Sequence, residues 1–205
     1  MYALLISTAL VTASPRVACP GATNGSGVVV GVKDGFAFVL TAAHVAKFDG
    51  IEVQFFPSPD PKASWFAASP EVVKRWPEPD LALVKFRVGP RPVPVLPLAA
   101  SGKRPKAFPV AAAAIGMGQG QETPTVWADE ILAKRFVRKS PQSAAFFWET
   151  RRPPEGGRSG GPLVVGGRVI GICAANSGGR GYYTHTDEIH AALTRDGFGW
   201  LVPRE

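Results

Sequence analysis

Short apolar runs separated by turn residues recur along most of the chain. The runs at 27–32 and 36–40 are rich in valine and phenylalanine and flank an Asp-Gly turn, and those at 162–165 and 168–173 flank a Gly-Gly turn. Such turns between β-branched or aromatic runs are strong hairpin signals. The pattern therefore predicts antiparallel strand pairs in both halves of the chain.

The rest of the pattern completes a mainly β structure. A Pro-rich segment at 89–106 interrupts the strand rhythm and is typical of a connection between two halves. Near the C-terminus the apolar period changes, which predicts a short helix at 187–195, capped by Thr186 and followed by Gly197. Further strands are expected at 51–56, 64–67, 71–76, 81–86, 108–115, 125–136 and 144–149.

Composition supports a globular, all-β protein. The chain has 205 residues, of which 45% are hydrophobic, and its 23 Gly and 20 Pro fit frequent turns between short strands. The net charge of +7 comes from scattered basic residues, which favours a solvated basic surface over a nucleic-acid or other polyanion site. Two Cys and three His lack metal-ligand spacing, so neither a metal nor a cofactor is expected. A disulfide between Cys19 and Cys173 stays open, although Cys173 lies in an apolar run typical of a buried thiol.

The N-terminal segment has features of an export signal. Residues 1–13 are mainly apolar and carry Val11 and Ala13 where a secretory signal has its cleavage site, but they lack a basic start. We therefore expect residues 1–14 to be a signal peptide or a tail, with a first strand as the alternative, and the protein to be exported. No apolar run is as long as a membrane span.

One stretch combines a serine with four glycines. Residues 156–163 read Gly-Gly-Arg-Ser-Gly-Gly-Pro-Leu, and so many glycines carry an entropy cost unless the backbone needs positive φ or close approach. A substrate carbonyl would explain both, with Ser159 as the nucleophile and the N–H groups of Gly157 and Ser159 as an oxyanion hole. A serine hydroxyl needs a base and a group that orients that base.

Both partners have candidates upstream. His44 follows the strand at 36–40 after small residues that permit a tight turn. Asp80 stands between a Pro-stiffened loop and an apolar strand, where an ionised carboxylate is costly to desolvate unless it has a partner such as a histidine N–H. Glu78 is the competing carboxylate, but it lies in the loop.

These motifs carry a resemblance to a known family. Thr-Ala-Ala-His at 41–44, Asp-Leu-Ala-Leu at 80–83 and Gly-Arg-Ser-Gly-Gly-Pro at 157–162 resemble, in this order, the catalytic motifs of trypsin-like (chymotrypsin-fold) serine peptidases, nearer to the compact bacterial and HtrA-type members. The resemblance implies two six-stranded antiparallel β-barrels, at 15–95 and 96–205, with the active site between them. It also implies the triad Ser159, His44 and Asp80, acting on a polypeptide substrate.

The chain departs from the family pattern beside the nucleophile and in the primary specificity pocket. Arg158 replaces the acid that receives a new N-terminus in animal enzymes, so we expect activity without that switch. The pocket floor falls near Pro153, which gives no support for a Lys or Arg preference, and small apolar or medium polar side chains are expected instead. By resemblance, the pocket walls include Ala174, Ala175 and Asn176.

Two other classes of function stay open at this point. A catalytically inactive protease fold that serves as a binding module would keep the same motifs without turnover, and a polyanion-binding protein would use only the net positive charge. The three separate motifs favour the peptidase.

Overall fold

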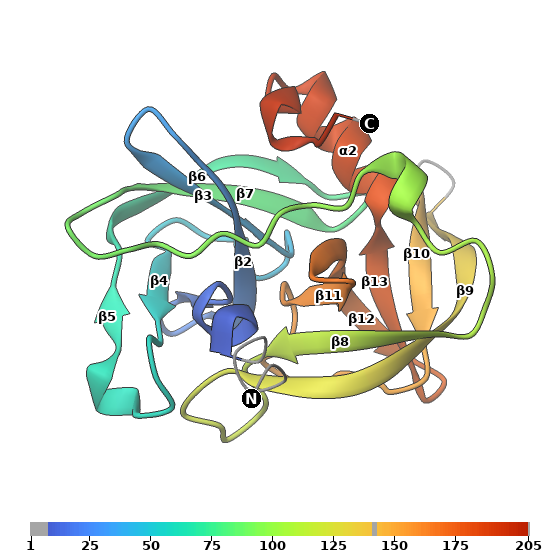
Figure 1. Ribbon diagram of the computed structural model, residues 1–205, viewed down its shortest axis with the longest axis horizontal. Helices are drawn as coiled ribbons and strands as arrows, with labels where there is room; N and C mark the ends of the chain where they lie inside the picture. Colours follow the sequence, from blue (N-terminus) through green and yellow to red (C-terminus); the bar gives the residue numbers. More distant parts are fainter. Residues whose placement is uncertain (1–7, 141–142, 205) are drawn as a thin grey trace.

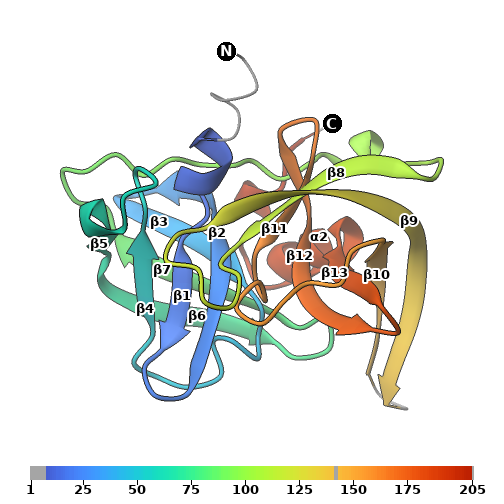
Figure 2. The same cartoon turned by 90° about the horizontal axis from the view of Figure 1, so that it is seen from below.

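The computed structural model describes residues 8–140 and 143–204 and consists of two β units side by side (Figures 1 and 2). The first unit is a seven-stranded sheet in the order β5-β4-β1-β2-β3-β7-β6, and the second is a closed six-stranded barrel in the order β10-β13-β12-β11-β8-β9. The strands of the first unit are β1 (Arg16–Cys19), β2 (Thr23–Lys33), β3 (Phe36–Thr41), β4 (Glu52–Phe55), β5 (Trp65–Phe66), β6 (Ala68–Trp76) and β7 (Leu81–Arg87). Those of the second are β8 (Val110–Gly116), β9 (Thr125–Ser140), β10 (Ser143–Thr150), β11 (Pro162–Val165), β12 (Arg168–Ser177) and β13 (Arg180–His185).

The predicted all-β fold class is confirmed, and so are the two hairpins that the turns predicted. β2 pairs antiparallel with β3, and β11 pairs antiparallel with β12. The first unit differs in detail from a six-stranded barrel, because it has seven strands and its end strands β5 and β6 are not paired with each other in the described residues.

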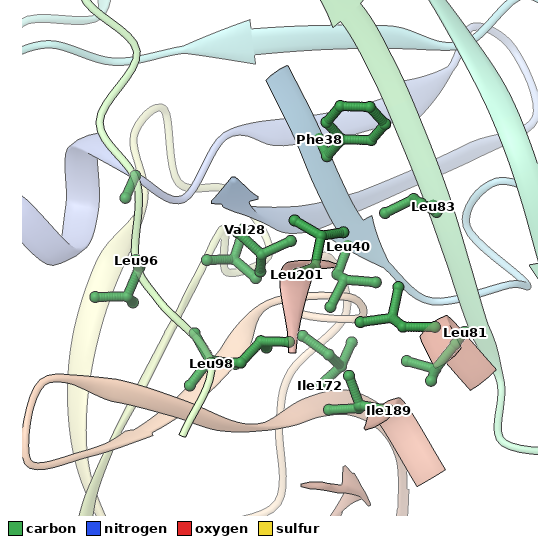
Figure 3. Close-up of a cluster of buried hydrophobic side chains, with 14 of the residues drawn as sticks. Val28, Phe38, Leu40, Leu81, Leu83, Leu96, Leu98, Ile172, Ile189 and Leu201 are labelled. Carbon is green, nitrogen blue, oxygen red and sulfur yellow. The ribbon is translucent and has the colours of Figure 1, made fainter. Parts of the chain in front are cut away.

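One shared core joins the two units. Val28, Leu40 and Leu81 of the first unit pack in the same buried cluster as Ile172 of the barrel and Ile189 of the C-terminal helix (Figure 3). Burial of such side chains stabilises the contact by about 25 cal/mol per Å² of apolar surface. The loops at the ends of the two sheets are therefore held in a fixed relation to each other.

The C-terminal helix α2 (Thr186–Arg195) begins one residue earlier than predicted. The predicted cap is wrong: Thr186 is the first helical residue, and Nδ1 of His185 accepts the N–H of Asp187 at 3.0 Å. A ring nitrogen can satisfy a free N–H at a helix start as a hydroxyl does. Gly197, just past the end, has the positive φ of a helix stop (88°).

The described part of the N-terminal segment belongs to the folded unit. Residues 8–12 are helical, and Leu10 and Ala13 are buried in the shared core. The carbonyl of Ala13 accepts the N–H of Val29 at 2.9 Å. Residues 1–7 of the predicted signal lie outside the described residues, and export stays a prediction.

Candidate active site

Strand pairing brings the predicted base and its orienting acid together. β3 and β7 run antiparallel with Thr41 opposite Ala82, so the chain that leaves β3 meets the chain that enters β7. His44 Nδ1 donates to Oδ2 of Asp80 at 2.8 Å, and the backbone N–H of His44 donates to Oδ1 at 3.1 Å. Both carboxylate oxygens of Asp80 thus hold His44, which fixes the ring tautomer with a proton on Nδ1 and leaves Nε2 free to accept a proton.

The surroundings suit these two roles. The Asp80 side chain is 11% exposed, whereas that of His44 is 48% exposed and open to a substrate. Asp80 adopts a positive φ of 55°, which Asp tolerates better than most residues. The carbonyl of the preceding Pro79 accepts the hydroxyl of Thr184 at 2.6 Å, and this bond fastens the Asp80 loop to the barrel strand β13.

The serine turn is held against the end of β3. Gly160 has a φ of 84°, and a Cβ there would lie 2.2 Å from both the Ser26 carbonyl and Oγ1 of Thr41. Its N–H donates to the carbonyl of Cys173 at 2.7 Å. Only glycine fits this position, and the close approach places Ser159 beside the segment that carries His44.

The predicted oxyanion-hole donors are free. Gly157 has a φ of 90°, and a Cβ there would lie 2.9 Å from the carbonyl of Met117. Within residues 8–140 and 143–204, neither the N–H of Gly157 nor that of Ser159 donates a hydrogen bond. Two unpaired N–H groups beside a nucleophile are what an oxyanion site requires.

Ser26 is the site residue that sequence analysis missed. Its N–H donates to the Ser159 carbonyl at 2.7 Å, and its hydroxyl donates to the Gly157 carbonyl and accepts the N–H of Met117, both at 2.8 Å. Ser26 therefore ties the first sheet to the backbone of Gly157 and of Ser159, the predicted nucleophile. A short polar residue in a Gly-rich strand entry gives no local signal of contacts so distant in sequence.

Arg158, next to the predicted nucleophile, points into the protein. It is 1% exposed, and its guanidinium donates to the carbonyls of Ala114, Gly116 and Thr125 and to the Thr125 hydroxyl, at 2.8–3.2 Å. It also lies 3.7 Å from the ring centroid of Trp127. Burial lowers the pKa of this arginine. Its side chain therefore anchors the turn that carries Ser159 to β8 and β9.

The predicted pocket residues lie on β12. Ala174 is buried, whereas Ala175 and Asn176 are exposed. The Asn176 amide donates to the carbonyl of Pro154 at 2.8 Å, and a Cβ on Gly181 would lie 2.8 Å from the carbonyl of Arg152. The segment around Pro153 therefore lies against β12 and β13, where the pocket floor was predicted.

The Ser159 hydroxyl and the His44 ring share no hydrogen bond in the described residues. Such catalytic bonds are often long without substrate and shorten in the complex. The structure therefore brings His44 and Asp80 into contact and sets the Ser159 turn beside them.

Both cysteines are free and buried, so the disulfide is not formed. Burial raises the pKa of the Cys173 thiol to about 12, which makes it an inert apolar group.

Within residues 8–140 and 143–204 no three His, Cys, Asp or Glu side chains gather as metal ligands. No helix there is long and apolar enough to cross a membrane.

Comparison with known proteins identifies the family of this chain. Residues 25–172 match the trypsin-like peptidase domain family. The chain therefore belongs to the trypsin-like peptidases, as the motifs indicated, and this membership supports a hydrolase that acts on polypeptides. A search of the curated proteins found no match.

Solved structures show the same fold. The inactive form of the Rv3671c protease is 20% identical with a TM-score of 0.72, over 94% of this chain and 92% of that one. The active form, from M. tuberculosis, is 21% identical with a TM-score of 0.72, over 92% and 82%. The HtrA-type protease AlgW with a tripeptide is 23% identical with a TM-score of 0.69, over 93% of this chain and 62% of that one. At these identities the likeness concerns the fold alone.

Proposed function

We propose that the protein is a serine endopeptidase that works through Ser159, His44 and Asp80 and forms an acyl-enzyme. The observation that carries the proposal is the double hydrogen bond from His44 to the buried Asp80 carboxylate. A carboxylate that accepts both the ring and the backbone of one histidine leaves only the far ring nitrogen free to take a proton.

The geometry supports a two-step reaction. Ser159 Oγ attacks the carbonyl carbon of the scissile bond while Nε2 of His44 takes the hydroxyl proton. The new oxyanion accepts the free N–H groups of Gly157 and Ser159. The His44 cation then protonates the leaving amine as the C–N bond breaks. Water, deprotonated by the same ring, hydrolyses the ester and restores Ser159.

Pocket chemistry supports a substrate residue without a long cationic side chain. The segment at the predicted floor carries Pro153 rather than an acid, and Arg152 next to it is a cation. A cationic substrate side chain would therefore find no counter-charge at this floor. We propose cleavage after small apolar or medium polar residues.

Digestion of a peptide library by the purified protein tests the proposal. The wild type should give cleavages that Ser159→Ala abolishes and that Ser177→Ala, a serine at the end of β12, leaves unchanged. The same cleavages from wild type and Ser159→Ala would overturn the proposal. No cleavage by either protein, with Ser159 unreactive toward a fluorophosphonate, would favour the inactive binding module.

A further inference from the structure

A cavity of about 280 Å³ lies at the end of the barrel where β13 meets α2. Figure 1 shows the segment before β8, in green, passing the start of α2 at this end. His185 ends β13, whereas Gly181, which packs on the predicted pocket floor, stands near its beginning. The cavity is therefore separate from the proposed active site. Its lining residues are Ser101, Arg104, Pro105, Lys106, Phe108, Lys134, Trp148 and His185.

The charges around this cavity are unbalanced. Three cations line it, and Arg104 and Lys134 both bind the Asp187 carboxylate at its edge, the latter at 3.1 Å. Lys106 makes no hydrogen bond or ion pair with any residue of the described ranges. Three positive charges thus face one negative charge, and the ammonium of Lys106 is left without a counter-ion.

His185 adds a neutral donor to the wall. The residue is 1% exposed, and its Nδ1 accepts the N–H of Asp187, so the ring proton is on Nε2. Burial lowers the pKa of His185 to about 4, which keeps the ring neutral at pH 7. Among described residues Nε2–H has no hydrogen-bond partner. The His185 Nε2 atom is not one of the fully buried unpaired atoms, so a ligand acceptor that enters the cavity can reach it.

Two aromatic rings form the apolar wall. The His185 ring lies against Trp148 with centroids 4.0 Å apart, and Phe108 lies 6.0 Å from Trp148. The Trp148 N–H already donates to the Ile170 carbonyl, so this residue offers the cavity only its apolar faces. The cavity is slightly smaller than the range typical of drug-sized ligands, which limits the occupant to a small group.

We infer that this cavity is a binding site for a small carboxylate with an apolar body, held by Lys106 and the His185 Nε2–H and flanked by Trp148 and Phe108. A free organic acid and an acidic side chain of a polypeptide present the same group. The site is independent of the proposed catalysis.

Titration of the full chain by NMR with benzoate, followed at the Trp148 indole and His185 ring signals, tests this inference. Benzoate should give saturable shifts, and benzyl alcohol, which has the ring without the charge, should not. Lys106→Ala should weaken benzoate binding by up to about fivefold. Lys103→Ala removes an exposed cation from the same segment outside the cavity and should leave binding unchanged.

Further arms identify the source of the carboxylate and the place of binding. If an acetylated glutamate peptide shifts the same signals and binds with higher affinity than benzoate, the site is assigned to polypeptides. If benzoate binds with the higher affinity, the site is assigned to free acids. Ser159→Ala should bind benzoate as the wild type does. The inference is overturned if neither benzoate nor the acetylated glutamate peptide gives saturable shifts. It is also overturned if Lys106→Ala and Lys103→Ala bind benzoate equally tightly.

Discussion

Replacement of Asp80 by asparagine separates the electrostatic role of this residue from its packing. Asparagine has nearly the same shape, and its Oδ1 still accepts the N–H of His44. Its amide, however, donates to Nδ1 where the carboxylate accepted, so the ring proton moves to Nε2. His44 then faces Ser159 with a donor and cannot take the hydroxyl proton.

The size of the effect follows from the geometry. Asp80 Oδ2 lies 2.8 Å from His44 Nδ1, and the carboxylate is largely buried. At an effective dielectric constant of about 20, this contact stabilises the histidine cation of the transition state by about 6 kcal/mol. Since about 1.4 kcal/mol corresponds to a tenfold change in rate, kcat should fall by about four orders of magnitude.

The assay is steady-state kinetics on a peptide that the wild type cleaves, with Glu78→Gln as control. Glu78 is an exposed carboxylate two residues away in the same loop, and its loss changes the net charge equally. Asp80→Asn should lower kcat with KM nearly unchanged, and Glu78→Gln should leave both constants near wild type. The reasoning fails if Asp80→Asn keeps more than about a tenth of wild-type kcat, or if the two variants lose activity alike.

Other positions give independent tests. Gly157→Val places a β-branched residue where the backbone has a φ of 90° and where a Cβ would clash with the Met117 carbonyl. The Gly157 N–H should then lose its orientation, so kcat should fall at least about 100-fold in the same kinetic assay. Arg158→Ala removes the donor from buried carbonyls and should lower the free energy of unfolding in urea by about 3 kcal/mol or more. An unchanged free energy of unfolding would show that the turn around Ser159 is held without Arg158. Leu10→Ala should cost about 2–3 kcal/mol in the same measurement, because Leu10 is 6% exposed in the core; an unchanged midpoint would show that residues 8–13 do not contribute. For His185 the folded pKa of about 4 lies below the ordinary 6.5, so the unfolded chain binds the extra proton and stability falls as the pH drops from about 6.5 to 4. His185→Asn retains a helix cap but has no titrating ring. With solvent screening taken into account, this variant should lose roughly 2 kcal/mol less stability than the wild type between pH 7 and 4. Equal pH profiles of stability would contradict the burial argument.

Much of the fold and the site was visible in the sequence because the signals are local. The Asp-Gly and Gly-Gly turns fix two hairpins. The small residues after β3 and the Pro-stiffened loop before β7 mark the strand ends at which His44 and Asp80 lie. A strand register then suffices to bring those two residues together.

The remainder depends on contacts between distant segments. Ser26 binds Gly157 across 131 positions, and Arg158 donates to backbone carbonyls that any residue supplies. The sequence excluded an ion pair between Arg158 and a new N-terminus but gave no sign of where the guanidinium goes. The cap of α2 was missed because Thr186 and His185 can both accept an N–H, and only the backbone geometry decides which does.

Intact-mass and peptide-map analysis after treatment with a fluorophosphonate tests the central claim most directly. The account predicts one adduct per chain, located on Ser159, and its loss in His44→Ala, because the hydroxyl is reactive only when His44 takes its proton. An adduct on another residue, or equal labelling of Ser159 in wild type and His44→Ala, would contradict it.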